Sequence, residues 1–184
     1  MRDIILYEAL IPSLQRLYEV DYDNIHFGVS ERNICARLAH HMETLMREYD
    51  DRHSNRYFDR YYADVEYNRM GNGDLKCYEK ENRPQYMVSD LLIQARGYGR
   101  NLLAVEMKRK GNYRNVKGDK ERLKSLVSSP DNEIIARRCV HNTVLGAFVV
   151  YSEKGVKIEL FENAGGKGTK TGEINLVYRF GHLV

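Results

Sequence analysis

Two short apolar segments joined by a turn-rich linker constrain the fold of this chain more than any other feature. Residues 91–93 and 102–105 are unbroken apolar runs, and the linker 96–101 contains two glycines and an asparagine. Short apolar runs bounded by such residues are typical of buried strands, and a turn-rich linker between them predicts an antiparallel hairpin. We therefore expect a buried hairpin at about residues 86–108, in the centre of a sheet.

Charged residues stand at the ends of both apolar runs. Asp90 precedes the first run, whereas Glu106 and Lys108 follow the second. Side chains at positions i and i+2 of a strand share a face, so Glu106 and Lys108 point the same way, and the hairpin brings Asp90 opposite them. Carboxylates beside apolar strands are costly unless something pairs them, and Mg²⁺ is usually held by one or two carboxylates plus phosphate oxygens. The hairpin therefore predicts a metal site with Asp90 and Glu106 as ligands.

At these residues the chain resembles the PD-(D/E)xK nuclease superfamily, which has the restriction-endonuclease-like fold. The family's aspartate corresponds to Asp90, its second acid to Glu106 and its lysine to Lys108, while Ser89 stands where the family has a proline. The similarity covers about residues 28–162, within a single domain of residues 1–184.

The order of the surrounding segments is also similar to that of small, stand-alone members of this superfamily. A helix beginning at Glu31-Arg32, a strand ending in residues 64–69, the hairpin and a second helix containing residues 119–124 follow one another. The resemblance implies an α/β fold with an αβββαβ core, in which helices flank a mixed central sheet. An N-terminal helix and a C-terminal hairpin are added to that core.

The individual elements follow from apolar periodicity and from turn residues. Residues 75–86 are expected to form an extended loop or the arm of a hairpin. The other expected helices lie at residues 3–20 (broken or kinked at Pro12), 30–49, 117–128 and 132–138. The other expected strands lie at residues 61–69, 143–151, 156–161 and 174–180.

The resemblance implies a phosphodiesterase that depends on Mg²⁺ or Mn²⁺ and cleaves DNA, as an endo- or exodeoxyribonuclease, with RNA left open. Asp90 and Glu106 would hold the ion, Lys108 would offset charge in the transition state, and Glu31 would support the ion from the first core helix. Many members of the superfamily act as dimers, so a homodimer is also left open. Two alternatives remain: a catalytically silent module that binds nucleic acid or another partner, and a plain structural domain.

Each of these four residues also has an ordinary structural interpretation. Asp90 could make a local backbone hydrogen bond, and Glu106 could form a salt bridge at the strand end. Lys108 could be a solvated surface lysine. Glu31 lies in a first helical turn, where the helix dipole favours an acid in any case.

Basic residues are concentrated around the proposed site. Between residues 96 and 124 the chain has ten Lys or Arg residues and three Asp or Glu residues, although the net charge of the whole chain is only +3. A basic rim suits a phosphodiester substrate, because phosphate contacts supply most nucleic-acid affinity, and a solvated face is the open alternative. The residues proposed to bind DNA are Arg109, Lys110, Lys117, Lys120, Arg122 and Lys124.

The rest of the composition narrows the class of protein. The length of 184 residues fits one domain with a sizeable core. No apolar run is long enough to cross a bilayer, and residues 1–6 do not resemble a secretion signal. The three cysteines match no zinc pattern, and their odd number argues against a disulfide framework, so a cytoplasmic location without membrane association is expected.

Overall fold

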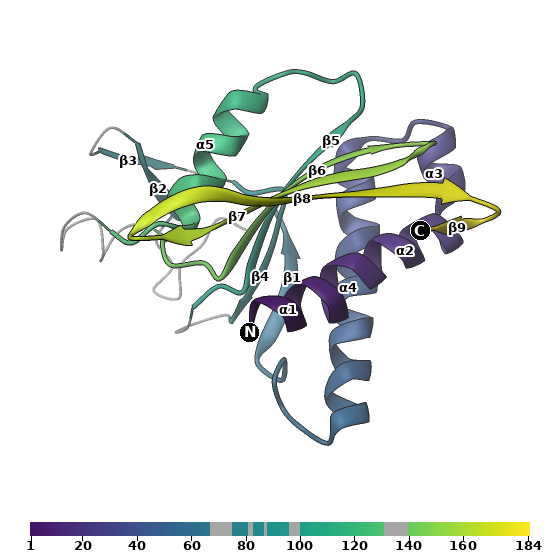
Figure 1. The fold of residues 1–184 in the computed structure, drawn as a ribbon, viewed down its shortest axis with the longest axis horizontal. Coiled ribbons are helices and arrows are strands. Elements are labelled where there is room, and N and C mark those ends of the chain that lie inside the picture. The colour runs from purple at the N-terminus through teal and green to yellow at the C-terminus, as the bar shows by residue number, and fades with distance from the viewer. Residues whose placement is uncertain (67–74, 81–82, 87, 96–99, 131–139) are drawn as a thin grey trace.

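A seven-stranded sheet forms the centre of the protein in the computed structural model, which describes residues 1–66, 75–80, 83–86, 88–95, 100–130 and 140–184 (Figure 1). In their order across the sheet, the strands are β1 (Tyr61–Val65), β4 (Leu91–Ala95), β5 (Leu103–Arg109), β6 (Leu145–Ser152), β7 (Gly155–Ala164), β8 (Lys167–Arg179) and β9 (His182–Leu183). Strands β5 and β6 are parallel, and the other neighbouring pairs are antiparallel. The sheet is therefore mixed.

Helices cover both faces of this sheet. They are α1 (Arg2–Ile4), the π-helical turn η1 (Ile5–Leu10), α2 (Ile11–Val20), α3 (Tyr22–His26), α4 (Glu31–His53) and α5 (Val116–Val127). Helices α2 and α4 pack on one face and α5 on the other (Figure 1). A parallel pair of strands needs a crossover connection, and α5 lies within the one that joins β5 to β6.

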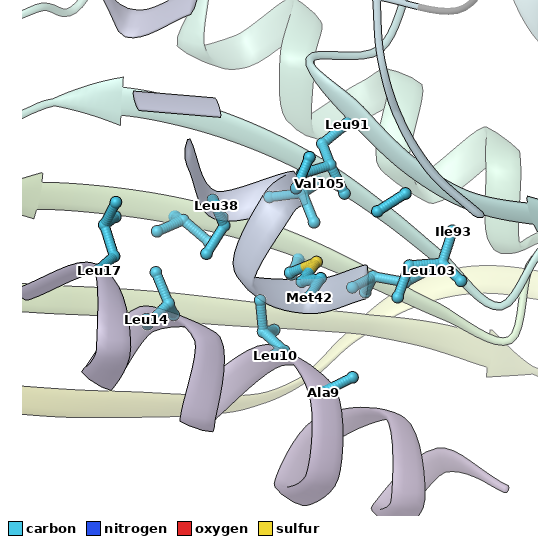
Figure 2. Close-up of a cluster of buried hydrophobic side chains, with 14 of the residues drawn as sticks. Ala9, Leu10, Leu14, Leu17, Leu38, Met42, Leu91, Ile93, Leu103 and Val105 are labelled. Atoms are coloured by element: carbon cyan, nitrogen blue, oxygen red, sulfur yellow. The ribbon is translucent and has the colours of Figure 1, made fainter. Parts of the chain in front are cut away.

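The alternation of side chains along β4 and β5 divides the core between the two faces. Leu91, Ile93, Leu103 and Val105 are fully buried against η1, α2 and α4, as Figure 2 shows. Leu92 and Ala104, the intervening residues, pack under α5 instead. Successive strand residues point to opposite faces of the sheet. The charged residues at these strand ends, Asp90, Glu106 and Lys108, therefore point to the face that α5 covers.

The predicted central hairpin is confirmed. Strands β4 and β5 pair antiparallel, with Leu91 opposite Val105. Residues 96–99 of the predicted linker lie outside the described residues. The predicted hairpin arm is also present, because β2 (Cys77–Lys80) and β3 (Arg83–Tyr86) form a separate two-stranded antiparallel sheet.

The N-terminal part of the chain differs from the prediction in detail. In place of a simple kink at Pro12, the chain forms the π-helical turn η1 directly before α2, and Pro12 lies in the first turn of α2, where its missing N–H is not needed. The expected connection after residue 20 contains the short helix α3. Helix α4 continues to His53, beyond the expected end near residue 49, and ends at Ser54 in the left-handed conformation with φ of 50°.

The C-terminal part is more extensive than the predicted hairpin. Strand β8 starts at Lys167, where the sequence predicts no strand before residue 174, and β7, β8 and β9 form a three-stranded meander. The predicted helix at 132–138 and the end of the predicted strand at 67–69 lie outside the described residues. Among the helices that the structure describes, none combines the length and apolarity needed to cross a membrane.

Candidate metal site

Asp90 and Glu106 lie across from each other at one end of the β4–β5 hairpin. The register of β4 with β5, continued by one residue beyond Leu91 and Val105, sets Asp90 opposite Glu106. The Met107 amide donates a 2.8 Å hydrogen bond to Asp90 Oδ2. The N–H and C=O of a strand residue point toward the same neighbouring strand, so the Met107 carbonyl is directed to the side of β5 on which β4 lies.

Asp90 is partly buried, and only one of its two carboxylate oxygens accepts a hydrogen bond from a described residue. Burial raises the pKa of the Asp90 carboxyl, while the Met107 amide and the Lys108 ammonium act in the opposite direction. The contact with Met107 is a backbone hydrogen bond of the kind that a purely structural role for Asp90 predicts. It uses one oxygen, and no described residue donates to Oδ1. Asp90 can therefore keep this hydrogen bond and still offer an oxygen to a ligand.

Glu106 is fully buried and is closed by a guanidinium group. Arg122 Nε lies 2.7 Å from Oε1, and Arg122 Nη2 lies 2.7 Å from Oε2. Nη2 also donates to Asp119 Oδ1 at 2.8 Å. Burial raises the pKa of Glu106, and the two hydrogen bonds from Arg122 oppose that shift. Glu106 thus forms a salt bridge, as a purely structural role predicts. The base that it pairs with is Arg122 on α5 and not a neighbour along β5.

Lys108 is enclosed by acids and is not a solvated surface lysine. Its Nζ lies 3.3 Å from Asp119 Oδ2 and 3.8 Å from Glu31 Oε2, and its side chain is 15% exposed. Burial alone lowers the pKa of Lys108, but the charges of Asp119, Asp90 and Glu31 outweigh burial, so the net shift is upward. Lys108 is therefore held as an ammonium ion beside the two strand-end acids.

Glu31 ties the start of α4 to the chain that follows β5. Ser30 caps the helix, with its Oγ accepting from the Asn33 amide at 3.3 Å. Glu31 Oε1 then accepts hydrogen bonds from the Arg109 amide at 2.9 Å and from Asn112 Nδ2 at 2.8 Å. These contacts hold Glu31 beside Lys108, so in this arrangement it is the neighbour of the lysine.

The cluster contains more acid than base. It has four carboxylates and two bases, which leaves an excess of two negative charges when all are ionised; these residues are Glu31, Asp90, Glu106, Asp119, Lys108 and Arg122. That excess equals the charge of one divalent cation, and the donors are the oxygen ligands that Mg²⁺ and Mn²⁺ prefer.

The residues present fit a divalent ion with a partial set of protein ligands. Among the described residues, no group of three or more His, Cys, Asp or Glu side chains is arranged to hold a metal. Asp90, Glu106 and the Met107 carbonyl would supply part of the coordination shell, and water and phosphate oxygens would have to complete it. The contact of Arg122 with both Glu106 oxygens is the obstacle to this arrangement.

The six residues proposed to bind DNA fall into two groups. Lys110 and Lys124 are exposed and pair with no described acid, and Lys117 is 92% exposed, with only a 3.9 Å approach to Glu121. The other three are engaged by acids: Lys120 lies 2.8 Å from Glu159, Arg109 lies 3.8 Å from Glu153, and Arg122 is held in the cluster. The exposed group remains free for a partner.

Sequence reasoning underestimated the part played by Asp119 and missed two asparagines. Asp119 is buried and joins Lys108 to Arg122, although the sequence predicts for it only a place in the second helix. Asn115 Nδ2 donates to Asp119 Oδ1 at 3.1 Å, as Asn112 does to Glu31. The spacing of Asp119 and Arg122 could have indicated their contact from the sequence, since helical residues three apart are neighbours.

Comparisons with known proteins leave the function to be argued from this geometry. No protein-family model matches the chain, and searches of curated proteins and of solved structures also found no match.

Proposed function

We propose that the chain is a Mg²⁺- or Mn²⁺-dependent nuclease that hydrolyses phosphodiester bonds in DNA and has a restriction-endonuclease-like core. The observation that carries this proposal is the position of Asp90 opposite Glu106, with Lys108 on the same face of the hairpin. The chain order α4, β1, β4, β5, α5, β6, with β5 parallel to β6, supports an αβββαβ core.

Each residue of the cluster has a role in this proposal. Asp90 and Glu106 bind the cation, with the Met107 carbonyl beside them. A divalent ion bound there would lower the pKa of a water molecule and polarise the phosphate. Lys108, kept as an ammonium ion by Asp119 and Glu31, donates to a phosphate oxygen as charge develops on it. Glu31 acts by positioning Lys108 and the segment that follows β5.

The exposed bases give the substrate its electrostatic attachment. Lys117 and Lys124 lie on α5, the helix that covers the Glu106 face of the sheet, and Lys110 follows β5 directly. Contacts of such residues with phosphates are independent of base sequence and weaken as salt rises.

A cleavage assay on DNA with Mg²⁺ or Mn²⁺ tests the proposal. Asp90→Asn and Lys108→Met are expected to lower the cleavage rate by about 10²–10³-fold, as loss of one electrostatic contact to a transition state typically does. Lys154→Met, which removes an exposed positive charge outside the cluster and outside the proposed DNA-binding residues, is the control for loss of charge. Unchanged cleavage in both Asp90→Asn and Lys108→Met would refute the nuclease proposal.

One observation favours the catalytically silent alternative. Both oxygens of Glu106 are occupied by Arg122, as in a purely structural ion pair. Salt-dependent binding of DNA by wild-type protein, with no cleavage in either metal, would support that module over the nuclease.

A further inference from the structure

Arg122 and a divalent cation need the same carboxylate. Glu106 is fully buried, so only groups inside the cluster reach its oxygens, and the Arg122 fork covers both of them at 2.7 Å. Charge-assisted bidentate pairs of this kind are strong and have a fixed geometry. A cation that takes Glu106 as a ligand therefore competes with the guanidinium group.

Asp119 gives Arg122 a second anchor. Arg122 Nη2 already lies 2.8 Å from Asp119 Oδ1, one helical turn away on α5. A guanidinium group that releases Glu106 would keep this countercharge, so release does not leave a buried charge unpaired. The Arg122 side chain is 15% exposed, so part of it already contacts solvent.

The guanidinium group also has donors that are not used within the protein. Arg122 Nε and Nη2 make the contacts with Glu106 and Asp119, whereas Nη1 donates to no described residue. A guanidinium group carries five N–H donors in a planar fork that matches phosphate oxygens. The unused edge of Arg122 is thus suited to a phosphate group at the same site.

We propose that Arg122 holds Glu106 while no divalent cation is bound and must release at least one Glu106 oxygen when a cation binds. Released from Glu106, the guanidinium group stays on Asp119 and presents its free N–H groups to a substrate phosphate. Arg122 is thus a positioning residue that sets the metal affinity of the site. This inference depends on the metal site of the proposed function.

The direct test is Mn²⁺ binding to the full chain, measured by isothermal titration calorimetry. Arg122→Gln is expected to bind Mn²⁺ about tenfold more tightly than wild type or more, because the competing bidentate contact is lost. Lys124→Gln, which removes an exposed charge from the same helix, is expected to match wild type. Arg122→Lys keeps the charge without the fork and is expected to lie between the two.

The outcomes separate this inference from the proposed function. Binding by all four proteins, with Arg122→Gln no tighter than Lys124→Gln, would overturn the competition and leave the metal site intact. Equal Mn²⁺ affinity of Arg122→Lys and wild type would show that the bidentate guanidinium contact is not what competes with the cation. Absence of Mn²⁺ binding in wild type and all variants would overturn the metal site itself, and this inference with it.

A second measurement on wild-type protein covers the possibility that Arg122→Gln fails to fold. The Nε–H group of Arg122 gives its own signal in ¹⁵N NMR spectra, and its donation to Glu106 Oε1 at 2.7 Å gives that signal an unusual environment. Titration with diamagnetic Mg²⁺ is expected to shift or broaden the signal as binding saturates. An unchanged Arg122 signal at saturating Mg²⁺, with binding shown by a shift of the Met107 amide, would overturn the inference.

Discussion

The Met107 amide donates to Asp90 Oδ2, whereas the facing acid, Glu106, is held by the Arg122 side chain. Asp90 is fixed by a main-chain group and retains an oxygen that no described residue uses. Glu106 is fixed by a side chain that occupies both of its oxygens. A ligand that binds both acids therefore finds a free oxygen on Asp90 but must displace Arg122 from Glu106. Variants of the two residues should for this reason behave differently.

Asp90→Asn should separate stability from metal binding. The asparagine oxygen can still accept from Met107, and the substitution removes a charge whose burial is unfavourable. Without metal we therefore expect Asp90→Asn to be at least as stable as wild type. Asp90→Ala leaves the Met107 amide without its acceptor and should be less stable than Asp90→Asn by about 1–3 kcal/mol.

Urea denaturation with and without Mg²⁺ checks this prediction. Wild-type protein should gain stability from Mg²⁺, because a ligand that binds only the folded state stabilises it. Both Asp90 variants should lose that gain. Full Mg²⁺ stabilisation of Asp90→Asn, or equal stability of the two variants, would contradict the arrangement at Asp90.

The buried acids predict an unusual dependence of stability on pH. Burial raises the pKa of both Asp90 and Glu106, so the folded state binds their protons more tightly than the unfolded state does. Stability from these groups is present below the unfolded pKa and is lost as pH rises. For Glu106 the window begins at the ordinary value of 4.5 and extends upward, because the effect of burial exceeds that of the two Arg122 hydrogen bonds. The metal-free protein should therefore lose stability across this range.

Unfolding free energies in chelator-treated buffer, measured at several pH values across that window, check the sign. Glu106→Gln should flatten the curve because it removes the titrating group without changing the shape of the side chain. Saturating Mg²⁺ should also flatten the wild-type curve, since the cation favours the ionised carboxylates. A wild-type curve that rises through the window, or a Glu106→Gln curve as steep as wild type, would show that Arg122 outweighs burial.

The hairpin could be predicted from the sequence, whereas the partner of Glu106 could not. The apolar runs and the turn residues are local signals, and strand parity then sets Glu106 and Lys108 on one face. Arg122 reaches Glu106 across 16 residues, and it does so only because α5 packs over β5. Nothing in the spacing of these residues along the chain identifies which of the many nearby bases fills that position.

The C-terminal strands show a second limit of sequence reasoning. The first half of β8 is rich in Gly, Lys and Thr, so it lacks the apolar alternation that identifies a strand. That half is stabilised by its main-chain pairing with β7 and by packing of the strand against α5. Such tertiary contacts override the weak local preference for a strand.

Two glycines of β8 provide a matched test of that packing. A Cβ at Gly168 would overlap the main-chain carbonyl of Lys124 at the end of α5, whereas a Cβ at Gly172 would meet Leu160 Cδ1 at an ordinary 3.6 Å. Gly168→Ala should therefore cost about 1–3 kcal/mol through overpacking. Gly172→Ala should change stability by only about 0.5 kcal/mol or less. Thermal denaturation of both variants checks this, and equal effects would show that β8 does not lie this close to α5.

Glu31 is the residue for which the sequence and the structure suggest different roles. The resemblance assigns it support of the metal ion, whereas its described contacts are to the Arg109 amide, Asn112 and Lys108. Glu31→Gln keeps an oxygen that can accept both hydrogen bonds, and it removes the charge that faces Lys108. If Glu31 positions the lysine, Mg²⁺ affinity should stay at the wild-type value while the rate of DNA cleavage falls by about 10–100-fold, as is typical for loss of a supporting contact.

Glu31→Ala completes this test, because it also removes the acceptor for Arg109 and Asn112. We expect it to lower both cleavage and thermal stability, whereas Glu31→Gln should lower cleavage alone. Calorimetric titration with Mg²⁺ and a cleavage assay on the same preparations give the two quantities separately. Loss of Mg²⁺ affinity in Glu31→Gln to the level of Asp90→Asn would instead make Glu31 a contributor to the metal site. Lys108 would then be held mainly by Asp119, which approaches its Nζ more closely, at 3.3 Å.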